Sequence, residues 1–153
     1  MTTVASMEAV DRFLACRTIA LAGASRSGRK FGNAVLRALI ANGYRVIPVH
    51  PSASSLEGLP CVSSLTAIHE RVDGLVTVVP PPRTEALVRE AGQIGITRVW
   101  MQQGSESAEA VEFCAEHGMQ EVHGECLIMF LKQSSGMHRF HHWVNGVLGK
   151  LPR

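Results

Sequence analysis

A short glycine-rich segment, residues 23–32, carries the side chains best suited to hold a phosphate group. Its glycines stand at positions 23, 28 and 32, and three basic residues lie between them: Arg26, Arg29 and Lys30. The spacing fits neither the G-x-G-x-x-G turn of dinucleotide-binding proteins nor a P-loop, in which Lys and then Ser or Thr follow the last glycine. Small residues let the backbone approach a ligand, and N–H groups at a helix start attract anions. We therefore predict a phosphate-binding turn of another kind.

The end of the next expected strand, residues 44–50, bears on the kind of nucleotide. Proteins that bind NAD place Asp or Glu there to accept hydrogen bonds from the ribose hydroxyls. Here His50 and Pro51 occupy the position, and the next acidic residue is Glu57. A carboxylate would repel a ribose phosphate and a histidine would not. The position favours a nucleotide with a phosphorylated ribose over NAD, and NADP remains allowed.

These turns need a scaffold that brings strand ends together, and the hydrophobic pattern predicts one. Apolar strands alternate with helices, which predicts an α/β fold: a Rossmann-like, doubly wound, mainly parallel five-stranded sheet with helices on both faces. We expect strands at 17–23, 44–50, 73–80, 96–104 and 119–124. We expect helices after a Ser6 cap, at 31–44 with Val35, Leu36, Leu39 and Ile40 inward, at 63–71 capped by Ser64, at 83–95, and at 105–118 opened by Ser105. Ligands bind outside the carboxyl ends of such strands.

Composition and length exclude several classes of protein. Of the 153 residues, 46% are hydrophobic and 18% charged, as in folded domains, and the net charge of +2 is too small to indicate a nucleic-acid partner. No apolar run is long enough to cross a membrane, and the first residues do not form a signal peptide. Four cysteines, far apart, suit a reducing compartment, so we expect a cytoplasmic protein. We predict one domain over 1–132 and an amphipathic tail over 133–153.

Three segments, in order, resemble the CoA-binding domain family, whose members are similar to the N-terminal domain of the succinyl-CoA synthetase alpha subunit. They are residues 19–51, residues 73–107 and the sequence "VHGECLIM" at 122–129. The resemblance implies that coenzyme A (CoA) or acyl-CoA is the ligand, with its phosphates on residues 24–27 near Lys30. His50, where the family often has Asn, would lie by the adenosine. The predicted ligand-binding residues are Gly23, Ala24, Ser25, Arg26, Ser27, Lys30, Phe31, Gly32, His50, Pro51, Val79, Pro80, Pro81, Met101 and Gln102.

Two parts of this set have an alternative reading from the residues alone. The proline turn at 79–83 is rigid and offers few donors, which suits packing against an adenine or an amide chain. Met101 and Gln102 either line the same crevice or belong to the core and the surface, and the sequence does not decide between these alternatives.

The resemblance implies a binding protein without catalytic activity of its own. The synthetase reaction needs a phosphorylated histidine on a second domain, which this sequence does not contain, and no catalytic triad or carboxylate pair stands out. We predict no catalytic residues. The alternative is an enzyme: an NADP-dependent oxidoreductase, or a synthetase-like subunit that needs a second chain for catalysis. Association with a second copy or with an acyl-CoA enzyme stays open.

Two groups outside the turns also invite chemistry. Cys126 follows the last expected strand; it is either a buried structural cysteine or a thiol that forms a mixed disulfide with CoA under oxidation. His138 and His142 share a helical face in the tail, but no cysteine or carboxylate lies close by to complete a metal site. We predict no metal, and expect Phe140 and Trp143 to pack on the body or on a partner.

Overall fold

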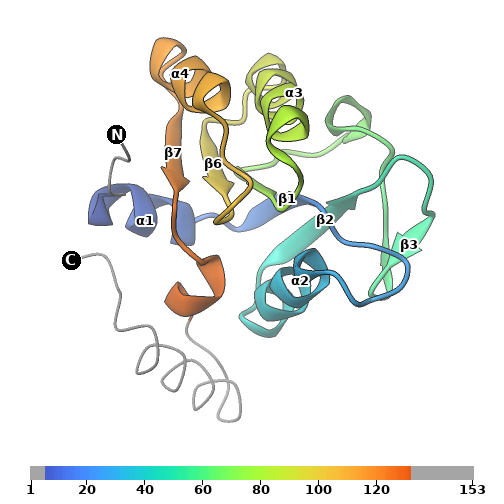
Figure 1. Cartoon of the computed structure of the whole chain (residues 1–153). Coiled ribbons are helices and arrows are strands. Elements are labelled where there is room, and N and C mark those ends of the chain that lie inside the picture. Colours follow the sequence, from blue (N-terminus) through green and yellow to red (C-terminus); the bar gives the residue numbers. More distant parts are fainter. Residues whose placement is uncertain (1–5, 132–153) are drawn as a thin grey trace.

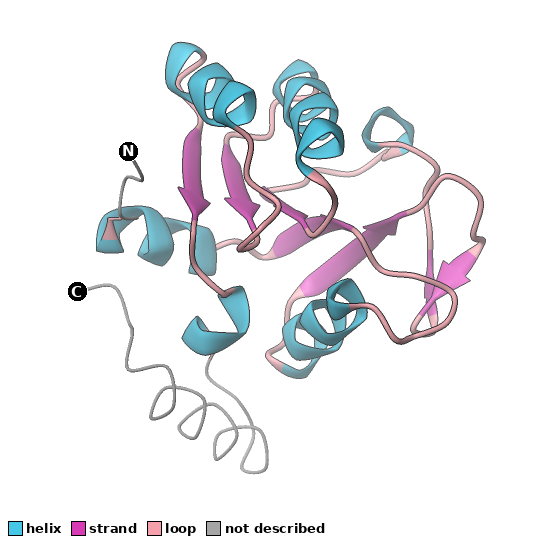
Figure 2. Cartoon of the chain, in the orientation of Figure 1, coloured by secondary structure: helices cyan, strands magenta, loops and turns pink. Residues whose placement is uncertain are grey.

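The structure, a computed structural model, describes residues 6–131 and contains one sheet of five parallel strands (Figures 1 and 2). The strands are β1 (Thr18–Ala22), β2 (Arg45–Val49), β5 (Gly74–Thr77), β6 (Arg98–Met101) and β7 (Gln120–His123), and their order is β2-β1-β5-β6-β7. The predicted fold class is confirmed. The strand order reverses between β1 and β5, so the carboxyl ends of these two strands form the switch point at which such sheets bind ligands.

Helices cover both faces of the sheet, as Figure 1 shows. One face carries α1 (Met7–Leu14), α2 (Phe31–Ala41) and the 3-10 turn η2 (Leu127–Phe130); the other carries η1 (Leu65–Ala67), α3 (Pro81–Gln93) and α4 (Ala108–Glu116). Successive strand residues point to opposite faces. Leu21 and Trp100 therefore enter the first core, and Ala20 and Val99 enter the second. Burial on both sides explains why the inner strands β1 and β5 are apolar runs, whereas the edge strand β7 contains Gln120 and Glu121.

A short hairpin between β2 and η1 was not predicted. It consists of β3 (Ser55–Leu56) and β4 (Leu59–Pro60), paired antiparallel. Its two turn residues, Glu57 and Gly58, have φ angles of +51° and +80°. Positive φ at both turn residues is the geometry of a tight hairpin turn, for which Asn-Gly and Asp-Gly are the usual signals. Glu-Gly is a weaker signal.

Two helix starts were predicted correctly and two were not. Helix α2 begins at Phe31, as predicted. Ser6 Oγ accepts the Ala9 N–H at 3.1 Å, which confirms the cap of α1. The cap of α4 is Ser107, whose Oγ accepts the Ala110 N–H at 2.9 Å; the predicted Ser105 is instead buried in a hydroxyl cluster. Helix α3 begins at Pro81, since proline fits the first helical positions.

Two other helix predictions were also wrong. The predicted helix at 63–71 is the single turn η1, without a side-chain cap from Ser64, because only Leu65 of its three residues is buried. In α2 the inward face is formed by Val35, Leu36 and Leu39, and Ile40 lies at the edge of this face, 39% exposed.

The four cysteines are all free thiols. Cys16 and Cys114 are buried, and Cys61 and Cys126 are half-buried. Burial raises the pKa of the Cys114 thiol to about 12, and it also raises the pKa of Cys16. None of the helices in residues 6–131 has the length and apolar character required to span a bilayer. The predicted tail, with His138, His142 and Phe140, lies outside the described residues, so the boundary at residue 132 stays a prediction.

Candidate functional site

Two glycines pack the turn after β1 directly against its neighbours. Gly23 has a φ of +126°, and a Cβ atom there would lie 2.3 Å from the carbonyl oxygen of Val78, just beyond β5. A Cβ at Gly32, in the first turn of α2, would lie 2.2 Å from the carbonyl oxygen of Gly23. Only glycine fits at either position. The unusual spacing of glycines in the sequence therefore reflects contact between the β1 turn, the start of α2 and the end of β5.

The turn is held in shape by Asn33, a fully buried polar residue. Its Oδ1 accepts the Ser25 N–H at 2.9 Å, and its Nδ2 donates to the Ser25 carbonyl and to Glu57 Oε2, each at 2.9 Å. Glu57 Oε2 also accepts from Arg37 Nη1 at 2.8 Å. This network links the turn to α2 and to the β3–β4 hairpin. Neither Asn33 nor Glu57 was predicted; the one available signal was an amide side chain in the first turn after a glycine loop.

The start of α2 is open to an anion. Its N-cap residue, Lys30, makes no side-chain cap, whereas the serine caps of α1 and α4 do. Uncapped N–H groups at a helix start, with the positive end of the helix dipole, attract negative charge. Ser25 Oγ and Ser27 Oγ lie 2.8 Å apart beside this helix start, and Ser27 Oγ accepts the Arg29 N–H at 3.2 Å. The predicted turn residues are thus brought together around one helix N-terminus.

His50, at the end of β2, is a neutral donor. Its Nδ1 accepts the N–H groups of Ser52 at 3.1 Å and Ala53 at 2.9 Å, which leaves the ring proton on Nε2. Burial lowers the pKa of His50, and the neighbouring positive charges, Arg26 foremost, lower it further. A cationic His50 would add charge where positive charge is already concentrated. The site therefore offers an uncharged N–H group among cations.

Four basic side chains at this edge have no carboxylate partner within residues 6–131: Arg26, Arg29, Lys30 and Arg83. Arg26 Nη2 donates to Ser52 Oγ at 2.9 Å, which joins the β1 turn to the segment after β2. Arg83, in the first turn of α3, adds its charge near His50 and was not in the predicted set. Unneutralised cations at one edge create a positive potential that favours a multiply charged anion.

The remaining predicted residues divide into exposed and buried ones. Pro51, Pro80 and Pro81 are exposed at the carboxyl edge, Phe31 is 49% exposed beside Lys30, and Val79 is half-buried with its N–H bonded to Ser105 Oγ. Ala24 is buried and offers only its backbone.

Met101 and Gln102 belong to the core. Met101 is fully buried under α3 and α4, and Gln102 is 3% exposed, with its Oε1 accepting the Leu127 N–H. Their side chains therefore cannot line an open crevice, which corrects the prediction for these two residues.

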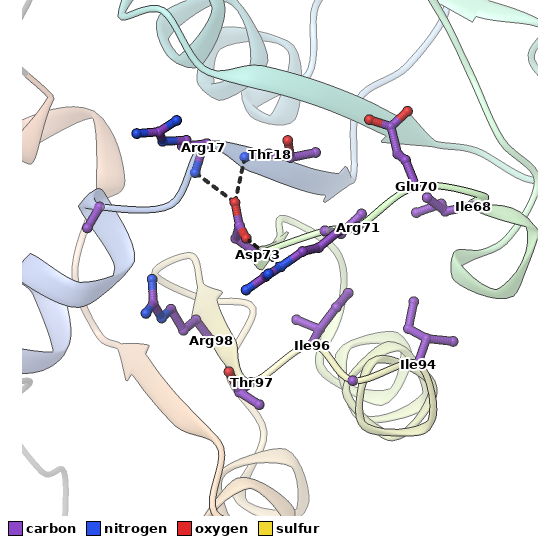
Figure 3. A pocket seen from close by; sticks show the side chains of 13 residues that line it. Arg17, Thr18, Ile68, Glu70, Arg71, Asp73, Ile94, Ile96, Thr97 and Arg98 are labelled. Atoms are coloured by element: carbon purple, nitrogen blue, oxygen red, sulfur yellow. Dashed lines mark hydrogen bonds and ion pairs between the residues drawn. The ribbon is translucent and has the colours of Figure 1, made fainter.

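The cavity next to the carboxyl edge is smaller than the one at the opposite edge of the sheet. The smaller one, of about 230 Å³, lies between the end of β2 and α3, with Val49 and Arg83 in its lining. The other, of about 600 Å³, lies at the opposite edge, where β1, β5 and β6 begin (Figure 3). Phosphate groups need donors and cations more than enclosure, so the carboxyl edge is the better candidate for an anion site. The glycine turn, the uncapped helix and the unpaired cations are all there.

Comparisons with known proteins identify the family to which this fold belongs. The family model described as CoA binding domain matches residues 17–132. The ADP-forming acetate–CoA ligase I of Archaeoglobus fulgidus is 29% identical over 130 residues, which cover 78% of this chain and 19% of the ligase. This chain spans 11% to 28% of the length of the first three curated relatives that it matches.

Two solved structures extend the comparison. A conserved hypothetical protein from Pyrococcus furiosus superposes with a TM-score of 0.69 at 38% identity, covering 72% of this chain and 96% of that one. The dinucleotide-forming acetyl-coenzyme A synthetase 1 of Ca. Korarchaeum cryptofilum gives a TM-score of 0.64 at 26% identity, covering 73% of this chain and 27% of the synthetase. The residues that the family model matches, 17–132, include the whole glycine turn, His50 and the start of α3. This chain belongs to the CoA binding domain family.

Proposed function

We propose that this chain binds coenzyme A, free or as an acyl thioester, at the carboxyl edge of its sheet, and that it has no catalytic activity of its own. One observation carries the proposal: the glycine turn at the switch point leads into an uncapped helix start, beside four cations without carboxylate partners. The family and the CoA-dependent names of several relatives support the same ligand.

The residues present fit the charges of CoA, which come in two groups. Residues 24–27 and the start of α2 would hold the diphosphate, since N–H and hydroxyl groups gather there. Arg26, Lys30 and Arg83, around the neutral His50, would hold the phosphate on the ribose. No carboxylate stands at the end of β2 to repel that phosphate.

The absence of catalysis is proposed from the surroundings of the turn. In residues 6–131, one histidine pairs with a carboxylate as in a catalytic dyad: His123 Nδ1 lies 2.6 Å from Glu121 Oε1. His123 is only 8% exposed, and its strand β7 is separated from β1 by two strands. This pair does not face the glycine turn. A synthetase-like subunit that takes its catalytic residues from a second chain would also have no catalytic pair beside this turn.

Calorimetric titration of the purified chain with four nucleotides tests the ligand. We expect CoA to bind, dephospho-CoA to bind about tenfold more weakly because a charged contact is lost, and NAD and NADP to bind more weakly than either. Binding of NADP in preference to CoA would support the oxidoreductase alternative. No heat with CoA at millimolar concentration would overturn the proposal.

A pair of variants tests the residues. Replacing both Arg26 and Lys30 by Ala should raise the Kd for CoA by at least about tenfold, while the melting temperature stays unchanged because both side chains are exposed. Arg89→Ala is the matched control, since Arg89 is an exposed arginine on α3 that pairs with Glu85. Equal affinity in the wild type and the double variant would contradict the placement of the ligand.

A further inference from the structure

The cavity at the amino edge of the sheet has a charged side and an apolar side. Its volume, about 600 Å³, falls within the range of small-molecule sites. Figure 3 shows Arg17, Arg71 and Arg98 on one side, around Asp73, and Ile68 and Ile94 on the other. The cavity lies where β1, β5 and β6 begin, opposite the proposed CoA site. What it binds is therefore a separate question.

Both carboxylates in its lining are already satisfied by other groups. Asp73 Oδ2 accepts the N–H groups of Arg17 at 2.9 Å and Thr18 at 3.0 Å, and its Oδ1 lies 3.5 Å from Arg71 Nε. The backbone hydrogen bond from Thr18, followed by that from Arg17, lowers the pKa of Asp73. Glu70 forms two short contacts with Arg45, at 2.6 and 2.7 Å. Neither carboxylate forms an ion pair with Arg17 or Arg98, although the charge of Arg98 contributes to the lowered pKa of Asp73.

Arg17 and Arg98 have no ion-pair partner among residues 6–131. Arg98 Nη1 donates to the Arg12 carbonyl at 3.1 Å and to Cys16 Sγ at 3.9 Å, and both acceptors are uncharged. Over residues 6–131, the guanidinium of Arg17 has neither an ion pair nor a hydrogen bond. Arg98 is half-buried, and a partly desolvated cation gains most from an anion beside it. The charged side of the cavity is therefore suited to a carboxylate.

The other side favours an apolar body. Ile94 follows α3 and is 39% exposed, one of the few large apolar side chains at the described surface. Ile68 is half-buried, and Ile96, only 1% exposed, lies to the left of Ile94 in Figure 3. A phosphate ion would leave these side chains uncovered, and an uncharged apolar molecule would leave the arginines unpaired. A molecule with both features would satisfy both sides.

We propose that this cavity binds a small monocarboxylate with an apolar tail. The carboxylate is held by Arg17 and Arg98, and the tail lies against Ile68 and Ile94. The site is formed by the strand starts and by the segments before β5 and β6. It does not depend on the CoA site, and either site can exist without the other.

Nuclear magnetic resonance of the full, ¹⁵N-labelled chain tests the proposal with hexanoate as the probe. We expect saturable shifts of the Arg17, Thr18 and Asp73 amides. Hexan-1-ol and inorganic phosphate, each lacking one feature, should bind at least about tenfold more weakly. Phosphate that binds as well as hexanoate would reduce the site to a bare anion site, and hexanol that binds as well would reduce it to an apolar patch. Either result, or no saturation, overturns the proposal.

Variants make the assignment residue-specific. Arg17→Gln should raise the Kd for hexanoate at least about tenfold, because it removes a charged contact. Ile94→Ser should raise it several-fold, because it removes apolar contact area. Both side chains are exposed, so we expect both variants to fold. Arg89→Gln, an arginine outside the cavity, should change nothing. Unchanged affinity in Arg17→Gln would contradict the proposal. A CoA titration of the same sample should shift residues 23–32; if only CoA fails to bind, the proposed function fails and this site stands.

Discussion

At the scale of single residues, His50 shows how neighbours set the state of a side chain that could itself carry charge. Two backbone N–H groups occupy Nδ1, and burial together with Arg26, Arg83 and Lys30 lowers the pKa of the ring. The ring therefore donates from Nε2 and adds no charge. A phosphate at this place meets cations on flexible side chains and one fixed neutral donor.

This state predicts how stability depends on pH. The unfolded chain takes up a proton at His50 below about pH 6.5, whereas the folded chain resists it until the pH reaches the lowered pKa. The contribution of His50 to stability is therefore complete above pH 6.5 and is lost as the pH falls. His50→Asn keeps an acceptor for the Ser52 and Ala53 N–H groups but does not titrate. We expect its melting temperature to fall less between pH 7 and pH 5 than that of the wild type; equal slopes in thermal unfolding would contradict this.

At the scale of elements, the β3–β4 hairpin braces the glycine turn at residues 23–32. Glu57 occupies the hairpin turn at a φ of +51°, and its carboxylate bonds both Asn33 and Arg37 of α2. Asn33 then fixes both the N–H and the carbonyl of Ser25. The shape of the turn thus depends on a hairpin more than twenty residues further along the chain.

A charge swap tests this bracing. Asn33→Asp replaces the donor Nδ2 by an oxygen that faces Glu57 Oε2 and the Ser25 carbonyl, so we expect the free energy of unfolding to fall by about 2 kcal/mol or more. Adding Glu57→Gln supplies an N–H donor to the new carboxylate and should restore part of the loss, as well as part of the affinity for CoA. Urea unfolding of the two singles and the double gives the coupling energy. Additive effects would mean that the two side chains do not interact.

The contact between the β1 turn and α2 leads to a second prediction at this scale. Gly32→Ala forces a Cβ to within 2.2 Å of the Gly23 carbonyl oxygen, which is backbone and cannot rotate away. We expect a loss of about 1–3 kcal/mol in unfolding free energy and weaker binding of CoA. Gly92→Ala is the control, because its Cβ would meet only the edge of the Phe113 ring at 3.2 Å. Similar denaturation midpoints for the two variants would show that the turn can move.

At the scale of the whole molecule, Trp100 joins the two ends of the described chain. Its ring packs against Phe13 of α1 at 5.5 Å and Phe130 of η2 at 5.6 Å, and its Nε1 donates to the Glu125 carbonyl at 3.2 Å. Trp100 is fully buried. The first helix and the last turn therefore meet on one face of the sheet through a single side chain of β6.

Removing the Trp100 side chain should lower the free energy of unfolding of the whole described domain, which we expect to unfold as one cooperative unit. Trp100→Ala leaves a large cavity between α1 and η2, and we expect it to cost about 3–5 kcal/mol of unfolding free energy. Circular dichroism in urea measures the change, and Ile94→Ala, at a partly exposed position, should cost far less. Loss of α1 alone, with the rest of the unfolding curve unchanged, would argue against one cooperative unit.

The sequence predicted the sheet well because the inner strands β1, β5 and β6 are largely apolar and buried, and turns bound all five strands. The edge strand β7 is of mixed composition, and only its last two residues are buried. The sequence placed the glycine turn and His50 directly after two strands because the apolar runs mark where those strands end. Their role in ligand binding stays a prediction. It could not predict that Ser107, two residues after Ser105, caps α4, since Ser105 is drawn into a buried cluster with Thr77 and Thr84 from other elements. Gln102 was misplaced for the same reason: its partner, the Leu127 N–H, is distant in sequence.

The buried cysteines have a practical consequence. An alkylating reagent attacks the thiolate, and Cys114 is both enclosed and, with a pKa of about 12, protonated at any ordinary pH. We expect the half-buried Cys61 and Cys126 to react with the reagent in the native protein faster than Cys16 and Cys114, which are buried and should react only when the fold opens. The labelling rate of Cys16 and Cys114 would therefore report how often the native fold opens, with no cysteine introduced by mutation.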